Sequence, residues 1–304
     1  MKIFLKMLLC AAFCCPLSAR AETVWVAGVS QEDGWYDANK DVANNLCWAA
    51  SASNLLAWWQ ARYQIPSHIP NGIDAIWNQY KTSATIDVGG DTHAAIQWWL
   101  TGVYLPTTSD RNDEQYDRTL FGPNETCTST LPSFEGYYYE RCNLNMGDVY
   151  HFICPEYRPA GTDEYLSSVG DYLMELVVQG CGVGLSVTDD TQDDDPMVHA
   201  LTLWGIEYEG DIISKLWLTD SDDNLKGYHA DGLFAVAVEQ SDGKMFISTT
   251  ESDWYTKEEK VYIDGILAIN PAVSNAWGLA LIPEPTTATL GLLALAGLAA
   301  RRRR

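Results

Sequence analysis

Three residues of types that support nucleophilic catalysis occur in the chain in the order cysteine, histidine, aspartate. Cys47 stands at the start of an expected helix, where the helix dipole and unpaired backbone N–H groups favour a thiolate. His199 opens an expected strand roughly 150 residues downstream, and Asp220 ends the next strand. A thiolate nucleophile requires a base that later acts as an acid, commonly a histidine oriented by a third group. The order therefore predicts a Cys-His-Asp triad.

The spacing between His199 and Asp220 indicates how these two side chains meet. The segments His199–Tyr208 and Ile212–Thr219 have the composition of strands, and a Glu-Gly-Asp turn separates them. A hairpin that turns at about Gly210 returns Asp220 to a position beside His199. We therefore expect the Asp220 carboxylate to bond to the second nitrogen of the imidazole.

Each of these residues also has an ordinary structural interpretation. Cys47 could be an inert buried thiol, and His199 could be a strand histidine whose ring nitrogens are satisfied in the core. Among the other histidines, His93 is the strongest alternative base, because it follows the turn Gly89-Gly90. The occurrence of Cys47, His199 and Asp220 in the catalytic order favours the functional interpretation.

Hydrophobic periodicity indicates helices in the first part of the chain and strands in the second. An amphipathic helix is expected from Cys47 through Trp59, with further helices at about His93–Leu100 and near Glu164–Gln179. Six strands are expected downstream, at Gly184–Val187, His199–Tyr208, Ile212–Thr219, Leu233–Val238, Met245–Thr249 and Val261–Ile269. This order predicts an α+β fold in which the helix of Cys47 packs on an antiparallel sheet.

Several uncommon residues near these positions resemble the IdeS/Mac family of secreted, papain-like cysteine peptidases, which degrade immunoglobulins. In the first half, the resemblance rests on Gly34-Trp35-Tyr36-Asp37-Ala38-Asn39-Lys40, Leu46-Cys47 and Asn54-Leu55-Leu56-Ala57-Trp58-Trp59. In the second half, it rests on Gly184-Leu185-Ser186, His199, Leu203-Trp204-Gly205 and Thr219-Asp220-Ser221-Asp222. The matches occur in one order over residues 34–224.

The resemblance implies a papain-like fold and endopeptidase activity on an extracellular protein, with no cofactor and no metal. Cys47 falls on the family's nucleophile, His199 on its general base and Asp220 on the residue that orients this base. Lys40 falls on a lysine that assists the oxyanion, and Asp222 falls on a second supporting aspartate.

The chain departs from the immunoglobulin-cleaving members at several places. Lys40 and Cys47 are closer together than in those members, and Trp48 follows the cysteine where they have glycine. A strongly acidic loop, Asp189–Pro196, precedes His199. Because loops beside the cleft determine substrate choice, the resemblance does not carry immunoglobulin specificity over to this chain.

Other interpretations remain open for the supporting residues. Asp220, Asp222 and Asn224 form an Asp-x-Asp-x-Asn pattern, which suits either a turn or the oxygen ligands of Ca²⁺. Lys40 could be an ordinary solvated lysine. The alternative function is a catalytically inactive surface protein-binding or matrix protein on the same fold, although such a protein has no need of a complete catalytic set.

The two ends of the chain predict export of one peptidase domain, residues 22–282. Residues 1–21 combine an early lysine pair, an apolar stretch and an Ala-x-Ala site, as in a secretory signal peptide. Residues 283–304 contain Pro-Glu-Pro, a short apolar segment and four arginines, and resemble a PEP-CTERM sorting tail. We expect export to the surface or extracellular matrix of a Gram-negative-type bacterium. Sorting and processing machinery would act on the tail, with only transient membrane contact; a permanent anchor is the alternative.

The charge balance bears on the class of partner. The chain has 41 acidic and 19 basic residues and a formal net charge of −22. Binding to nucleic acid requires clustered lysine and arginine against the phosphates, so this composition argues against a nucleic-acid partner.

Five cysteines remain once the expected signal peptide is set aside, and Cys47 stands far from the other four. An exported chain tolerates disulfides, and four cysteines allow three connectivities. We expect the pairs Cys127–Cys142 and Cys154–Cys181, which leave Cys47 as the odd thiol.

Overall fold

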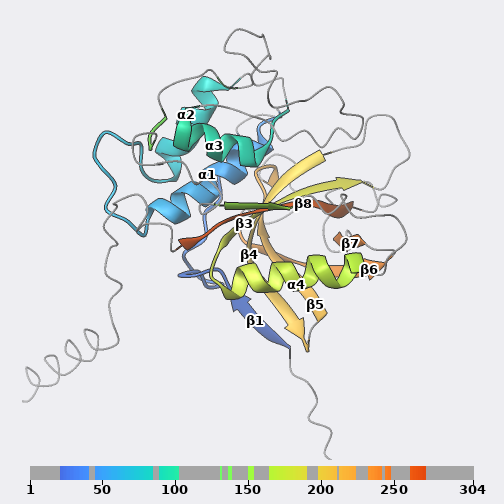
Figure 1. The fold of residues 1–304 in the computed structure, drawn as a ribbon. Coiled ribbons are helices and arrows are strands. Elements are labelled where there is room, and N and C mark those ends of the chain that lie inside the picture. The colour runs from blue at the N-terminus through green and yellow to red at the C-terminus, as the bar shows by residue number, and fades with distance from the viewer. Residues whose placement is uncertain are drawn as a thin grey trace, which may run out of the picture.

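The computed structural model describes residues 21–40, 45–84, 89–102, 131, 136–138, 150–153, 164–189, 198–210, 212–223, 232–241, 244–247 and 261–271. Helices and antiparallel strands make up the described chain, which confirms the α+β class (Figure 1). Within these ranges, no helix is both long enough and apolar enough to cross a membrane.

The strands form one antiparallel sheet that closes into a barrel. The ring consists of β3 (Gly182–Asp189), β4 (Val198–Glu209), β5 (Ile212–Thr219), β6 (Phe234–Ser241), β7 (Lys244–Ile247) and β8 (Val261–Ile269). β8 pairs with both β3 and β7, and the pairing of β4 with β5 completes the closure. β1 (Glu22–Trp25) pairs with β4, and β2 (Tyr150–Ile153) pairs with β8. Closure removes free strand edges and fixes the register of neighbouring strands.

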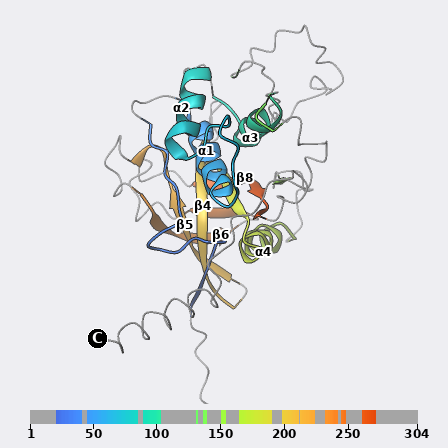
Figure 2. The same cartoon turned by 90° about the vertical axis from the view of Figure 1, so that its left-hand side faces the viewer.

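Buried side chains of β4 alternate between two hydrophobic cores. Leu201 and Leu203 join the core that α4 (Glu164–Val178) shares with the barrel strands, whereas Ala200 and Trp204 join a second core beneath three helices. These helices are α1 (Cys47–Gln60), α2 (Ile73–Ser83) and α3 (Thr92–Thr101). They gather on one side of the sheet, away from α4, as both views show (Figures 1 and 2). The alternation follows the two-residue period of a strand.

α1 lies very close to the sheet because β3 presents glycines to it. A Cβ atom at Gly182 would lie 2.7 Å from Cε3 of Trp58, and one at Gly184 would lie 3.2 Å from Cδ1 of Leu55. Every residue of α1 after Cys47 is buried, since α2 and α3 pack on it from the other side. The helix that begins at Cys47 is therefore enclosed between the sheet and two other helices.

Most expected elements are confirmed, several to within a few residues. The helices expected from Cys47, near 93–100 and near 164–179 are α1, α3 and α4, and the strands expected at Ile212–Thr219 and Val261–Ile269 coincide with β5 and β8. Three elements were missed: α2, β1 and β2. α2 carries Ile73, Ile76, Trp77 and Tyr80 at positions i, i+3, i+4 and i+7, so the helical period was present in the sequence and was overlooked.

One expected disulfide is wrong. Among the described residues, Cys47 and Cys181 both carry free thiols, so the bridge from Cys154 to Cys181 is not formed. Cys181 is instead buried in the apolar core between α4 and the barrel, and burial raises the pKa of its thiol to about 11. Cys127, Cys142 and Cys154 lie outside the described residues, as do the expected signal segment, the acidic loop before His199 and the sorting tail.

The close seating of α1 predicts that Gly182→Ala destabilises the fold. The added methyl group would overlap the Trp58 ring, which is rigid and buried, and overpacking of this kind costs about 1–3 kcal/mol. Urea unfolding followed by tryptophan fluorescence would show a lower midpoint than the parent. Gly89→Ala is the matched control, since a Cβ there meets nothing within 4 Å and its midpoint should not move. Equal midpoints for the two variants would contradict the packing argument.

Candidate active site

The sulfur of Cys47 sits at an uncapped helix start. α1 begins at Cys47, its N-cap is Leu46, and no described side chain accepts a hydrogen bond at this cap. Its first turn also contains no acidic residue. A capping carboxylate or hydroxyl would compete for the N-terminal N–H groups, and an acidic residue would repel a thiolate. The helix start is therefore suited to a developing negative charge at Cys47.

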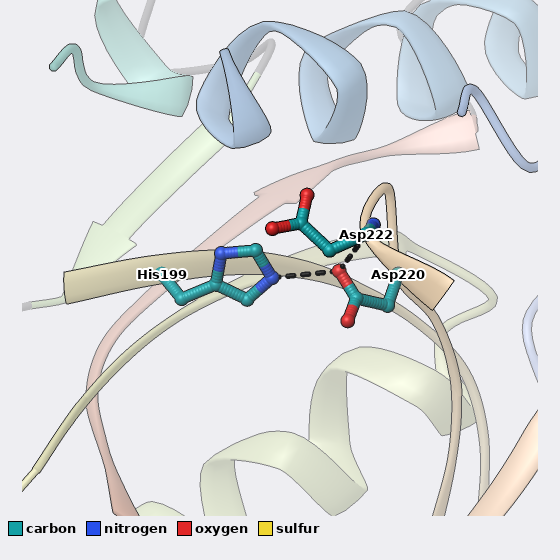
Figure 3. A group of neighbouring side chains, drawn as sticks. All are labelled: His199, Asp220 and Asp222. Atoms are coloured by element: carbon teal, nitrogen blue, oxygen red, sulfur yellow. Dashed lines mark hydrogen bonds and ion pairs between the residues drawn. The ribbon is translucent and has the colours of Figure 1, made fainter. Parts of the chain in front are cut away.

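The hairpin of β4 and β5 brings His199 and Asp220 together as expected. Thr202 on β4 lies opposite Thr219 on β5, which places the residues beyond these positions side by side. His199 Nε2 and Asp220 Oδ1 are 2.6 Å apart, and both side chains are buried. The Asp222 backbone N–H also donates to Asp220 Oδ1, at 3.1 Å, and holds this carboxylate in place (Figure 3).

The other ring nitrogen of His199 faces the helix that begins at Cys47. Figure 3 shows Nδ1 on the side of the ring that faces α1, opposite the bond to Asp220. The side chains of His199 and Cys47 are close enough for each to shift the pKa of the other, through charge and hydrogen bonding. The structure thus pairs Cys47 with His199, and it places the alternative base His93 on α3. Since Asp220 occupies Nε2, proton exchange with the sulfur falls to Nδ1.

The surroundings of the pair favour its charged form. Burial alone would raise the pKa of the Cys47 thiol, but this effect is outweighed by the His199 charge and hydrogen bond, the charge of Lys40 and the backbone N–H of Ala200, so the pKa is lowered. Burial alone would lower the pKa of His199, but Asp220 and the Cys47 thiolate raise it well above its usual value. The two shifts together describe a thiolate–imidazolium pair.

Lys40 is attached to the same segment by two bonds. Its side chain is only 3% exposed, and Nζ lies 2.5 Å from Asp222 Oδ1. Its backbone N–H donates to the carbonyl of Ser221, at 2.9 Å. The interpretation of Lys40 as a solvated lysine is therefore wrong. Because its charge lowers the pKa of the Cys47 thiol, the ammonium group acts on the nucleophile while it is neutralised by Asp222.

The donor atoms of His199, Asp220 and Asp222 lie within 4.8 Å of one another, which is close enough for a shared metal ion. Each of these groups is already in contact with a protein partner: His199 with Asp220, and Asp222 with Lys40. A cation would have to displace a buried ammonium group and break the hydrogen bond between imidazole and carboxylate. The arrangement therefore fits a triad beside an ion pair better than it fits a calcium site. Asn224, the third member of the expected calcium pattern, lies outside the described residues.

Comparison with known proteins relates the first part of the chain to a protein family. The family model described as Mac 1 matches residues 20–88, a segment that contains Lys40 and Cys47 and ends before His199. A search of curated proteins found no match. The matched segment supports the resemblance to the IdeS/Mac family of cysteine peptidases, whose members are secreted or surface-associated.

A set of buried polar side chains lies between α1 and the hairpin and was not among the expected site residues. Ser51 and Asn54 on α1 bond to β4, and Asn54 also bonds to Thr219 on β5. A polar residue on an otherwise buried apolar helix was the available signal, since such groups are kept only when they are hydrogen-bonded.

The charged pair predicts that Cys47 reacts with iodoacetamide well below the pH at which an ordinary thiol does. An unperturbed thiol, with a pKa of about 8.5, loses thiolate roughly tenfold for each pH unit below that value. A thiol of lowered pKa keeps its thiolate over that interval, so Cys47 should remain reactive at pH 6. His199→Ala removes the imidazolium charge, which should raise the thiol pKa and abolish labelling at pH 6 but not at pH 9. Mass spectrometry of the Cys47 peptide measures both rates, and identical pH profiles would contradict the pairing.

The buried ion pair predicts coupling between Lys40 and Asp222. Asp222→Asn leaves a buried ammonium group without its carboxylate and should destabilise the fold by about 3 kcal/mol, as when other buried pairs lose one partner. Lys40→Met with Asp222→Asn removes both charges and should recover most of this loss. Urea unfolding of the two single variants and the double variant measures the coupling energy. Strictly additive losses would show that the two groups do not interact.

Proposed function

We propose that the protein is an exported cysteine endopeptidase with a papain-like fold and a Cys47-His199-Asp220 triad. One observation carries this proposal: the imidazole of His199 bonds to Asp220 through Nε2, and the same ring acts on the Cys47 thiol. An inert buried cysteine would not require an oriented imidazole beside it. The match of residues 20–88 to the Mac 1 family model supports the same class of enzyme.

The first half of the reaction forms a thioester. The Cys47 thiolate attacks the scissile carbonyl carbon, a C–S bond forms, and the carbonyl π electrons move to oxygen. The His199 imidazolium then gives its Nδ1 proton to the amide nitrogen as the C–N bond breaks and the amine leaves. Asp220 keeps the ring in the orientation that presents Nδ1 to both the sulfur and the leaving nitrogen.

The second half regenerates the enzyme. Neutral His199 takes a proton from water, whose oxygen attacks the thioester carbon. When the tetrahedral intermediate collapses, the C–S bond breaks, the carboxylic acid product leaves, and Cys47 returns as the thiolate beside the imidazolium. All protons in both halves pass through groups of this chain.

Both tetrahedral intermediates carry an oxyanion, for which the site offers two donors. The backbone N–H of Cys47 is at the uncapped start of α1, and the Lys40 ammonium is close enough to act on the Cys47 sulfur. Asp222 fixes Lys40 through the buried ion pair and so acts as a positioning residue. Preorganised donors of this kind stabilise the transition state because they need not reorient during the reaction.

The proposal extends to the whole chain. Residues 1–21 act as a signal peptide, residues 22–282 form the peptidase domain, and residues 283–304 act as a sorting tail. The substrate is an extracellular protein, and the site of action is the cell surface or matrix. The acidic composition supports a substrate other than nucleic acid.

The test is hydrolysis of extracellular proteins, starting with immunoglobulins and matrix proteins, by the full-length chain. Cys47→Ala should abolish cleavage, because no other group replaces the sulfur nucleophile. Cys181→Ala is the matched control, since that thiol is buried in a separate core and has a raised pKa. Its rate should equal that of the parent, provided that it folds. Equal cleavage by Cys47→Ala and the parent, or no cleavage of any protein by a parent with a reactive Cys47, would overturn the endopeptidase proposal.

A further inference from the structure

One buried amide side chain connects the elements that carry the candidate site. Asn54 lies on α1 and is 2% exposed. Its Oδ1 accepts a hydrogen bond from the backbone N–H of Ala38, at 2.7 Å. Its Nδ2 donates to Thr202 Oγ1, at 3.1 Å, and to Thr219 Oγ1, at 3.4 Å. A single side chain therefore bridges the nucleophile helix, the segment before Lys40 and both strands of the hairpin.

The hydrogen-bond partners of Asn54 determine which way its side-chain amide group faces. Ala38 offers only an N–H group, so the amide oxygen must face it. Thr219 Oγ1 donates to the carbonyl of Tyr36 and accepts from the indole of Trp204. Because the hydroxyl hydrogen of Thr219 is already used, this oxygen can meet Asn54 only as an acceptor.

The hydroxyl hydrogen of Thr202 is also already used in a hydrogen bond. Thr202 Oγ1 donates to Ser51 Oγ, and Ser51 Oγ donates to the carbonyl of Leu201. The Asn54 amide group must therefore donate to Thr202 as well as to Thr219. A carboxylate at position 54 would keep the bond to Ala38 but would supply neither donor.

Each partner of Asn54 lies close in sequence to a residue of the candidate site. Thr219 precedes Asp220, Ala38 lies two residues before Lys40, and Thr202 lies three residues after His199. Asn54 itself lies two helical turns beyond Cys47, on the same rigid helix. A rotation or slide of α1 relative to β4 would break these bonds and change the separation of sulfur and imidazole.

We propose that Asn54 is a positioning residue that holds α1 in register with the β4–β5 hairpin, and so keeps Cys47 within reach of His199. This inference rests on the proposed function only in taking Cys47 and His199 as the reacting pair. Asn54 touches neither residue in this role, since it acts through Ala38, Thr202 and Thr219. Its contribution is specific to the charged pair, because a thiolate and an imidazolium stabilise each other only at short range.

The experiment measures iodoacetamide labelling of the Cys47 peptide at pH 6 and pH 9 in the full-length chain. At pH 9 a thiol of ordinary pKa is largely ionised, so the rate there serves as the reference for changes in access to the sulfur. In Asn54→Ala, the ratio of the pH 6 rate to the pH 9 rate should fall by about tenfold or more as the thiol pKa returns toward its ordinary value. Asn54→Asp should show the same fall, since it lacks the two donors.

Ser53→Ala is the matched control. Ser53 is buried on the same helix, and its hydroxyl donates to the carbonyl of Ala49 within that helix. Its removal should leave the ratio of rates unchanged even if the unfolding midpoint falls. Thr202→Val is the milder second variant if Asn54→Ala does not fold. It keeps the shape of the side chain, removes both the acceptor for Asn54 and the donor to Ser51, and should lower the ratio severalfold.

The outcomes separate this inference from the proposed function. A parent that labels at pH 6, together with Asn54→Ala and Thr202→Val variants that label with the same ratio, would overturn the positioning role and leave the triad intact. A parent that does not label at pH 6 would overturn the charged pair, and the positioning role with it. A lowered ratio in the Asn54 and Thr202 variants but not in Ser53→Ala supports the proposal.

Discussion

The contact between α1 and the strands β3 and β4 sets the separation of the two reacting groups. Cys47 belongs to the helical layer and His199 to the barrel, so the packing of one layer on the other holds the two residues together. The distance from the Cys47 sulfur to the His199 imidazole therefore depends on how closely α1 packs against the sheet. Gly182 and Gly184 allow the helix to sit against the backbone of β3, and the buried hydrogen bonds of Asn54 fix its position along the strands.

The site also concentrates charge in a region with little water. His199, Asp220 and Lys40 are each buried, and Asp222 is only 19% exposed. Isolated charges in such a place are costly, but the groups alternate in sign: ammonium beside carboxylate, and imidazolium between carboxylate and thiolate. Each charge thus has a partner of opposite sign, and the low dielectric of the buried site strengthens these interactions.

Much of this organisation could be predicted from the sequence, and the exceptions have physical causes. The helix of Cys47 and the hairpin of His199 and Asp220 could be predicted because each segment shows a long run of one hydrophobic period. The closure of the sheet could not be predicted, because the pairing of β8 with β3 joins segments far apart in sequence and depends on the whole barrel. The Cys154–Cys181 bridge failed because cysteine counting cannot distinguish a bridged thiol from one that packs as a small apolar group, as Cys181 does.

The position of β8 in the barrel has a consequence for when the site forms. β8 is the last strand of the described chain, yet it lies between β3 and β7, so the ring cannot close before residues 261–269 are available. Cys47, His199 and Asp220 are all synthesised earlier, on segments whose mutual arrangement depends on that closure. A nascent chain therefore contains all three residues before the closed ring that supports their alignment has formed. The strand order itself therefore postpones the aligned arrangement of Cys47, His199 and Asp220 until β8 has been synthesised.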